Sequence, residues 1–348
     1  MSDTAPIRPE ERFDESRVSN YLRKHLPELF PCDEVLFDQF PGGAANLTYR
    51  ARCVDGAEYV LRRAPLGPVA RGGHDMEREH RVLSRLWRSF DLAPRAYHYC
   101  QDPDVMGKPF FVMERRHGYV VRKTWPSTFV DDRVKQRTVA ESLVDALADL
   151  HGVNPSSVGL ETLGRPVGFI DRQIAGWTDR WFAAATRPVG DMEAVSSLLA
   201  EGVPDPQRVA ILHNDYKLDN AMIDEDGSLV AVFDWDMATL GDPLVDVGTL
   251  LAYWVQPDDP TYLVFGANAV AIGEVMPKEA VRERYASRSG LELANINYHE
   301  ALALFRIAVI IEQIYARYVA GQTSDSRFGE FETIAPLLAA AALVILDY

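Results

Sequence analysis

The residues best equipped for chemistry in this chain lie between positions 213 and 246, in the stretch HNDYKLDNAMIDEDGSLVAVFDWDMATLGDPLVD. Asp215, Asn220 and Asp234 provide two carboxylates and one amide oxygen within this stretch. Mg²⁺ prefers such oxygen ligands and keeps water molecules and substrate phosphates in the rest of its coordination sphere. We therefore expect Asn220 and Asp234 to hold a complex of a metal ion with a nucleotide, and Asp215 to face a substrate hydroxyl group.

A hairpin must position these side chains. The short apolar runs 221–223 and 229–233 flank an Asp-Gly turn signal, which predicts two antiparallel strands joined by a tight turn. Asn220 precedes the first strand and Asp234 follows the second, so the open end of the hairpin is expected to set them side by side. Asp215 lies on the loop that enters the hairpin.

The pattern H-x-D, four residues, N, hairpin and D resembles the catalytic and metal loops of the aminoglycoside phosphotransferase and choline kinase group, which are distant relatives of protein kinases. The resemblance implies that Asp215 positions the attacked hydroxyl group and accepts its proton, and that Asn220 and Asp234 bind Mg²⁺. HNDYKLDN followed by FDWDMATLGDPLVDVGTLLAYW is most similar to phosphotransferases related to the kinase-like domain fused to some acyl-CoA dehydrogenases.

The resemblance also implies a fold. It predicts a bilobal, protein-kinase-like α+β architecture that binds ATP and Mg²⁺. The N-terminal nucleotide-binding lobe, residues 1–117, would be small, antiparallel and β-rich. The C-terminal catalytic and substrate lobe, residues 118–348, would be larger and mainly helical. A chain of 348 residues is long enough for two such lobes.

Two adjacent glycines between predicted strands at 34–40 and 46–53 could let backbone amides approach phosphates, although they would suit any tight hairpin. QFPGGAANLTYRA is similar to the nucleotide-binding loop of the family. The resemblance therefore implies that Gly42, Gly43 and Asn46 bind the nucleotide.

In the predicted strand 58–63, Arg62 aligns with the lysine that kinases extend toward the α- and β-phosphates. This is a departure, because arginine carries a planar fork in place of a point charge, but arginine also occurs here in the branch named above. Glu79, on a predicted helix at 74–90, matches the carboxylate that pairs with that cation. Arg63 points to the other face of the strand, where we expect it to be solvated.

The strands 96–100 and 110–114 complete the predicted sheet. FFVMER resembles the segment that links the two lobes in the family. It implies adenine binding through backbone groups around Met113 and Glu114.

Several polar residues near the hairpin have structural explanations. His213 is expected to hold the loop by hydrogen bonds, Asp242 to cap a helix before a proline, and Asp246 to brace the loop. Asp236 would point to the same side of an extended segment as Asp234, so it could bind metal or be solvated. Asn214 stands where the family usually has glycine, and asparagine tolerates the left-handed conformation.

Predicted helices dominate the rest of the chain. The stretch GRPVGFIDRQIAGWTDRW is typical of the acyl-CoA-dehydrogenase-associated branch. Its residues Arg172, Gln173, Trp177 and Trp181 could line an acceptor pocket, or the aromatic residues could belong to the core. The other predicted helices cover residues 11–25, 131–151, 244–254, 278–289, 298–320 and 329–346.

Composition limits the choice of partners. The net charge is −15, and the acidity is uneven: residues 1–125 contain 20 Lys and Arg against 18 Asp and Glu, whereas the remainder contains 16 against 33. We therefore expect neither nucleic acid nor a membrane as a partner. The acidic part could favour a cationic acceptor or be a solvated surface.

The N-terminus lacks the apolar segment of a secretory signal, and the apolar run 336–346 is too short to cross a bilayer, so it is expected to pack on the core. Cys32, Cys53 and Cys100 are odd in number and widely spaced. They predict free thiols and a reducing cytoplasm.

The sequence thus predicts an ATP- and Mg²⁺-dependent phosphotransferase with a small-molecule hydroxyl acceptor. The acceptor could be an aminoglycoside, a hydroxyacyl thioester or another hydroxy metabolite, and the sequence does not indicate the oligomeric state. An alternative is a pseudokinase that binds nucleotide and acts through partners, although the presence of Asp215, Asn220 and Asp234 argues against it. A protein kinase is disfavoured because no DFG-to-APE segment follows Asp234.

Overall fold

A computed structural model describes residues 3–41, 46–54, 56–67, 75–266, 269–323 and 325–347. Contacts divide the chain into two compact units. Unit 1 consists of Met1–His117 and Ala231–Ala238, and unit 2 of Gly118–Val230 and Thr239–Tyr348. The sequence placed residues 231–238 in the C-terminal lobe, whereas their contacts belong to unit 1.

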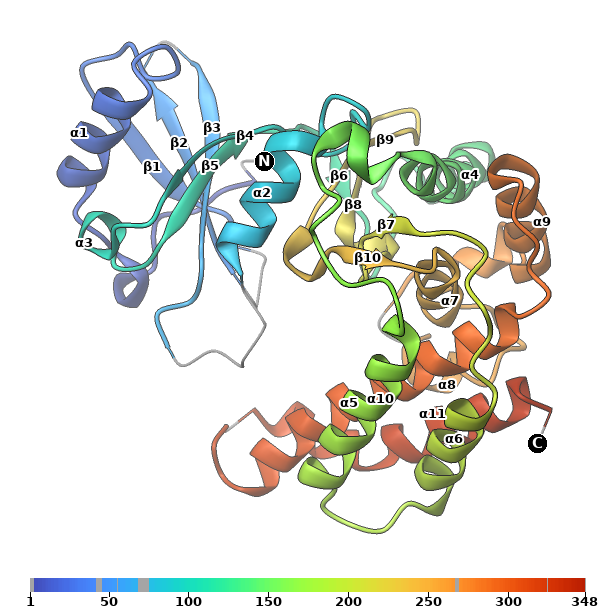
Figure 1. Cartoon of the computed structure of the whole chain (residues 1–348). Helices are drawn as coiled ribbons and strands as arrows, with labels where there is room; N and C mark the ends of the chain where they lie inside the picture. Colours follow the sequence, from blue (N-terminus) through green and yellow to red (C-terminus); the bar gives the residue numbers. More distant parts are fainter. Residues whose placement is uncertain are drawn as a thin grey trace. The chain divides into compact units, whose positions relative to one another are not determined.

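Unit 1 is built on a five-stranded antiparallel sheet with the strand order β1-β2-β3-β5-β4 (Figure 1). Alternating buried and half-buried residues along β2 show that one face of the sheet is covered more fully than the other. All five strands were expected from the sequence. They are β1 (Val35–Gln39), β2 (Leu47–Cys53), β3 (Glu58–Arg63), β4 (Ala96–Cys100) and β5 (Phe110–Glu114).

Helices cover this sheet because each presents one apolar stripe. In α1 (Glu15–His25), which Asp14 caps, Val18 and Leu22 are buried. In α2 (Met76–Leu86), Asp75 caps the first turn, and Glu79 is the one charged residue among the five that the helix buries. The short helices η1 (Pro9–Glu11) and α3 (Pro103–Met106) also belong to unit 1.

Arg63 does not lie in solvent, so that expectation is wrong. It does lie on the opposite face of β3 from Arg62, but this face is covered by the N-terminal segment, and Arg63 is only 1% exposed. Its guanidinium donates hydrogen bonds to the carbonyl of Met106 and, at 2.7 Å, to the hydroxyl of Tyr49. It also lies 5.5 Å from the ring of Phe13.

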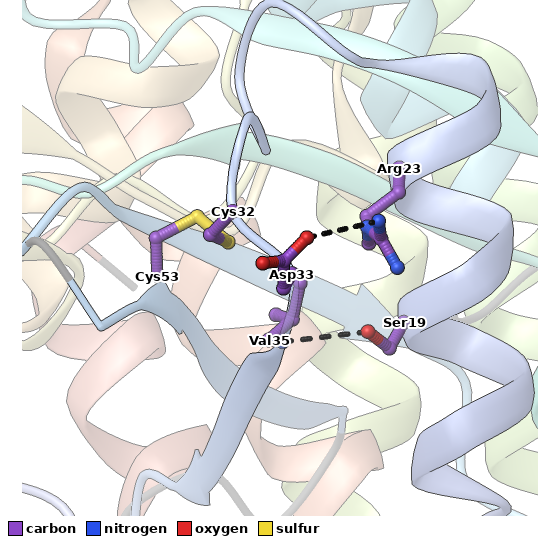
Figure 2. The surroundings of a disulfide bond; sticks show 6 residues. All are labelled: Ser19, Arg23, Cys32, Asp33, Val35 and Cys53. Atoms are coloured by element: carbon purple, nitrogen blue, oxygen red, sulfur yellow. Dashed lines mark hydrogen bonds and ion pairs between the residues drawn. A yellow bond between two sulfur atoms is a disulfide. The ribbon is translucent and has the colours of Figure 1, made fainter.

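Cys32 and Cys53 form a disulfide, which corrects the expectation of three free thiols (Figure 2). The register of the sheet explains the pairing, because Cys53 lies opposite Val35 and Cys32 precedes Val35 by three residues. On the other side of the same segment, the amide of Val35 donates to Ser19 at 3.3 Å. Cys100 is a free, buried thiol. Location in the cytoplasm stays a prediction.

Unit 2 is mainly helical (Figure 1). Its strand β7 (Ala210–Leu212) pairs with β10 (Thr239–Gly241). A second small sheet consists of β6 (Tyr119–Val120), β8 (Ala221–Ile223) and β9 (Leu229–Val232), and the first two residues of β9 belong to unit 2. The helices are α4 (Arg133–Gly152), α5 (Phe169–Ala184), α6 (Gly190–Glu201), α7 (Leu244–Ala252), α8 (Tyr262–Phe265), α9 (Lys278–Ser289), α10 (Ile296–Val319) and α11 (Ile334–Ile345).

The helix α10 is the centre of this unit and contacts α5, α6, α7 and α11. Its approach to α7 requires a glycine, because a Cβ atom at Gly248 would lie 2.4 Å from the carbonyl oxygen of His299. Buried residues of α5, α6, α7, α10 and α11 share one apolar cluster. Unit 2 therefore has one continuous helical core that supports the loop after β7.

The C-terminal helix packs on this core, as expected from its apolar sequence. Ala335, Leu338 and Ala342 of α11 are buried in the cluster. The stretch Ser326–Ile345 consists of η6 (Ser326–Thr333) and α11. It has the length and composition of a membrane span, with a mean hydropathy of 1.6. Core helices of non-membrane proteins satisfy the same criteria.

Candidate active site

The loop after β7 carries the predicted catalytic residues, and a buried carboxylate fixes its shape. Asp246 of α7 is fully buried and accepts hydrogen bonds from the backbone amides of His213, at 2.6 Å, and Asn214, at 2.7 Å. Asn214 has a left-handed backbone with φ of 67°. Both expectations, the brace at Asp246 and the tolerated conformation at Asn214, are confirmed.

Two histidines complete the support of this loop. His213 is fully buried, and its Nδ1 atom accepts from the amide of Asp215 at 3.3 Å, which fits the structural role expected of it. The ring of His151 lies between Asp246, 3.3 Å from Nε2, and Tyr285, 2.7 Å from Nδ1. Burial lowers the pKa of His151. The nearby Asp246 acts in the opposite direction but is the weaker influence, so the pKa lies below its usual value. His151 is therefore neutral near pH 7, and the charge of Asp246 acts mainly on the loop amides.

Asp215 lies in a small polar cluster within unit 2. Both of its carboxylate oxygens are 2.8 Å from Nζ of Lys217. The side-chain amide of Asn220 donates to the backbone carbonyl and to Oδ2 of Asp215, at 2.9 Å in each case. The side chain of Asp215 keeps 26% of its surface exposed. A carboxylate held in this way is oriented and still accessible to a substrate.

The sequence interpretation missed Lys217. Its backbone is extended, with φ of −160° and ψ of 166°, so the spacing D-x-K places the two side chains on the same side. This spacing was the available signal. Burial lowers the pKa of Lys217, but Asp215 and Tyr253 more than offset this and hold the pKa above its usual value. The ammonium group therefore stays charged beside the carboxylate.

The position of Asn220 suits a metal ligand. It is the last residue of η3 (Leu218–Asn220), directly before β8. Because its amide nitrogen is bound to Asp215, its amide oxygen points away from Asp215. An oxygen of this kind is what Mg²⁺ requires.

Unit 1 contains a second charged cluster. Nε of Arg62 lies 2.8 Å from the Glu79 carboxylate, and its Nη2 forms a short contact with Asp234. Burial raises the pKa of Glu79 to about 8, and Arg62 opposes this shift. Asp236 contributes to the electrostatic field at both partners. The strand cation and the helix carboxylate are therefore paired, as the resemblance implied.

The backbone around Asp234 differs from the expectation. Asp234 is left-handed, with φ of 69°, and the next residues form the 3₁₀ turn η4 (Trp235–Met237). Asp236 is thus not on an extended segment, and the argument that it shares a side with Asp234 is wrong. The turn is fixed by Trp235, whose Nε1 donates to the carbonyl of Val232 at 2.8 Å. Arg78 also holds it, by donating to the carbonyl of Ala238 at 2.9 Å.

The remaining predicted nucleotide ligands are only partly described. Gly42 and Gly43 lie outside the described residues, and Asn46 is buried with 3% exposure. Met113 belongs to β5, and the amide of Glu114 donates to the carbonyl of Arg95 at 2.8 Å. The amide of Glu114 is therefore already used within the sheet.

The residues considered for an acceptor pocket have mostly structural contacts. Trp177 and Trp181 of α5 are buried in the helical core, as the alternative interpretation held. Arg172 donates to the carbonyls of Arg165 and Val167 and so holds the loop before α5. Gln173 accepts a hydrogen bond from Trp177 Nε1 at 3.1 Å.

Asp242 is the cap expected before Pro243. Its carboxylate accepts from the amide of Leu244, the first residue of α7, at 2.9 Å. Burial raises its pKa, and the hydrogen bond from Leu244 opposes the shift. Asp242 therefore stabilises the helix that also carries Asp246.

Known proteins resemble this chain over most of its length. Acyl-CoA dehydrogenase family member 11 of Rattus norvegicus is 30% identical over 344 residues, which cover 96% of this chain and 44% of the relative. Acyl-CoA dehydrogenase family member 10 of Mus musculus is 29% identical, covering 94% and 30%. The chain thus spans less than half the length of these curated relatives.

Solved structures share the fold. A candidate aminoglycoside phosphotransferase from Ralstonia eutropha has a TM-score of 0.81 and 25% identity, covering 97% of this chain and 99% of that one. An ethanolamine kinase from Plasmodium vivax has a TM-score of 0.57 and 14% identity, covering 92% and 86%. A spectinomycin phosphotransferase, solved with ADP and spectinomycin, has a TM-score of 0.60 and 12% identity, covering 98% and 100%. These likenesses confirm the predicted kinase-like α+β fold.

The family model described as "Phosphotransferase enzyme family" matches residues 37–286, which include both charged clusters. The chain therefore belongs to the phosphotransferase enzyme family and is a small-molecule kinase.

Proposed function

We propose that this protein transfers the γ-phosphoryl group of ATP, in the presence of Mg²⁺, to a hydroxyl group of an acyl metabolite such as a hydroxyacyl-CoA. The observation that carries the proposal is the cluster of Asp215, Lys217 and Asn220. It combines an accessible carboxylate, a half-buried cation and an amide oxygen on one braced loop. These are the groups that phosphoryl transfer to an alcohol requires.

Each residue of this cluster has one task in the proposal. Asp215 accepts a hydrogen bond from the acceptor hydroxyl group, orients its oxygen for in-line attack and takes its proton. Lys217 keeps the Asp215 carboxylate in place and offers positive charge to the transferred group. Asn220 holds Mg²⁺ through its amide oxygen together with Asp234. Bound Mg²⁺ would neutralise charge on the phosphates.

Residues of unit 1 bind the nucleotide in this proposal. Arg62 contacts the phosphates, and Glu79 keeps the guanidinium in its orientation, as the 2.8 Å contact between them supports. Gly42, Gly43 and Asn46 bind the phosphates of the nucleotide. Adenine binds to backbone groups that begin with the Glu114 carbonyl, because the Glu114 amide is already bonded to Arg95.

The names of the relatives support an acyl acceptor. Both matched mammalian proteins are acyl-CoA dehydrogenase family members, and this chain corresponds to only part of each. A kinase segment joined to a dehydrogenase of acyl-CoA substrates is consistent with a shared class of metabolite. The antibiotic and amino-alcohol kinases are similar in fold alone and do not carry an acceptor assignment.

A coupled assay of ADP formation tests the proposal. We expect hydroxyacyl-CoA thioesters to accelerate ADP release over the rate without acceptor, and chelation of Mg²⁺ to abolish it. Asp234→Ala should keep a native circular dichroism spectrum and lose turnover. Nucleotide binding without Mg²⁺-dependent ADP release, with or without acceptors, would instead support a pseudokinase.

A screen that includes aminoglycosides, choline-like alcohols and sugars identifies the acceptor class. Acceleration confined to aminoglycosides would contradict the acyl assignment and leave the kinase assignment intact.

A further inference from the structure

A buried cation contacts the catalytic loop and has no role in the chemistry above. Arg306 of α10 is 6% exposed, and its Nη2 donates to the backbone carbonyl of Asn214 at 3.1 Å. Its Nε and Nη1 atoms are buried and have no hydrogen-bond partner among the described residues. Arg306 therefore retains donors directly beside the loop that carries Asp215.

Unused donors on a buried guanidinium require an explanation. A guanidinium carries five N–H donors, and a buried charged group left without acceptors destabilises the fold. Holding the Asn214 carbonyl uses only one of these donors. A neutral donor such as glutamine could make that single bond without burying a charge. The charged, planar guanidinium of Arg306 therefore indicates a partner with an anionic or strongly polar oxygen, and this oxygen would come from a ligand.

The neighbours of Arg306 include cationic and aromatic side chains. Its Cζ atom lies 5.7 Å from the centre of the Trp177 ring, and Cζ of Arg180 lies 4.4 Å from the centre of the same ring. Nζ of Lys217 lies 4.8 Å from the ring of Tyr253. This side of unit 2 therefore carries three cations and two aromatic rings.

The carboxylates that act on Arg306 are already engaged. They are Asp246 and Asp215, which raise its pKa against the lowering by burial. Asp246 is bound to two backbone amides, and Asp215 is bound to Lys217. Asp246 is therefore occupied by the loop, and Lys217 partly offsets the charge of Asp215. The loop of Asp215 thus carries both signs of charge, because Lys217 and Arg306 lie near Asp215 and Asp219.

We propose that Arg306, with Trp177 and Arg180 beside it, recognises an acyl oxygen of the acceptor, either the carboxylate of a hydroxy acid or the carbonyl of its thioester. This inference rests on the proposed function and names the group that selects its acceptor. The planar fork suits an acyl oxygen. The same charge repels the ammonium group of an amino alcohol or amino sugar.

The test compares acceptors of equal length. The kcat/KM is measured for a series of ω-hydroxy acids, for their coenzyme A thioesters and for amino alcohols with the same number of carbons. Wild type should prefer the acyl series, and the comparison of free acid with thioester shows which acyl oxygen is used. Arg306→Met should lower the preference for acyl acceptors over amino alcohols by about 10- to 100-fold, mainly through KM.

Two variants separate recognition from support of the loop. Arg306→Lys keeps a charge and can still reach the Asn214 carbonyl. If Arg306 only supports the loop, this variant should have near wild-type selectivity. If the planar guanidinium recognises the acceptor, the variant should lose part of the selectivity for acyl acceptors. Arg288→Met, which removes an exposed arginine of α9, should leave selectivity unchanged. Equal losses toward both acceptor classes in Arg306→Met would overturn the proposal, and so would a wild-type preference for amino alcohols.

Direct binding distinguishes failure of this inference from failure of the proposed function. Calorimetric titration of the hydroxy acids and thioesters into the nucleotide-free protein measures recognition without turnover. Binding to wild type that is lost in Arg306→Met would support Arg306 even if ADP release did not respond to any acceptor. Turnover of acyl acceptors with unchanged binding and kinetics in Arg306→Met would overturn the role of Arg306 and leave the kinase assignment standing.

Discussion

The brace beneath the catalytic loop allows a quantitative prediction for Asp246→Asn. Asp246 is fully buried, and each carboxylate oxygen accepts one backbone N–H, from Asn214 at 2.7 Å and from His213 at 2.6 Å. The substitution keeps the size of the side chain but turns one acceptor into an NH₂ group. Two donors then face each other at one of these contacts.

The magnitude follows from the two losses. Removing a hydrogen bond to a charged group costs about 1.5–3 kcal/mol, and leaving a buried N–H without an acceptor costs about 1–3 kcal/mol. We expect Asp246→Asn to lower the free energy of unfolding by about 3–5 kcal/mol, in the range of other broken buried charge contacts. Turnover should also fall, because the same amides position the loop that carries Asp215.

Urea unfolding, followed by tryptophan fluorescence and circular dichroism, measures this change. The matched control is Asp242→Asn on the same helix, where asparagine can still accept the single hydrogen bond from Leu244 and caps a helix as well as aspartate. Asp242→Asn should lower the free energy of unfolding by less than about 1 kcal/mol. If Asp246→Asn is no more destabilising than Asp242→Asn, the reasoning about the brace is refuted.

Two further predictions concern unit 1. Because the pKa of Glu79 is about 8 in the folded chain and 4.5 in the reference state, protonated Glu79 contributes stability that is complete below pH 4.5 and is lost as the pH rises through 8. The unfolding free energy of wild type should therefore fall more between pH 6 and 8.5 than that of Glu79→Gln, and parallel profiles would contradict this. The disulfide joins residues 21 positions apart, so its reduction should cost about 3 kcal/mol and lower Tm, while Cys53→Ser should not respond to reductant. Three reactive thiols in the non-reduced, denatured wild type would show that the bond is absent.

The local pattern around the hairpin could be predicted from the sequence because its signals are short-range. An Asp-Gly turn between two apolar runs indicates strands that the structure shows as β8 and β9. The cap at Asp242 followed from the rules for helix starts, because Pro243 comes next. The antiparallel arrangement of the small sheet followed from the resemblance, whereas its strand order was not predicted.

Other features depend on contacts between distant segments. Alternation along β3 correctly separates Arg62 from Arg63, but it cannot show that residues near Phe13 cover the second face and bury Arg63. Cysteine spacing cannot show that Cys53 lies opposite Val35 in the sheet. The charge balance of the C-terminal part likewise does not reveal that a buried cation, Arg306, contacts the loop of Asp215.

The conformation after Asp234 was missed for a local reason. The run FDWD reads as a continuing strand by its alternation, yet Asp234 takes a left-handed conformation and starts a 3₁₀ turn. Such a conformation is uncommon for aspartate and costs free energy. Contacts of Trp235 and Ala238 within unit 1 hold it, and they cannot be read from the local sequence.

The most direct test of the account is the rate of acceptor-dependent ADP formation in Asp215→Asn. The variant keeps the size of the side chain and removes the carboxylate that is proposed to take the proton. We predict a fall in kcat of about 10²- to 10⁴-fold, with a native circular dichroism spectrum and unchanged binding of Mg·ATP. Glu225→Gln, an exposed carboxylate on the same hairpin, should retain wild-type kcat. Equal turnover in Asp215→Asn and Glu225→Gln would contradict the central claim that Asp215 carries the reaction.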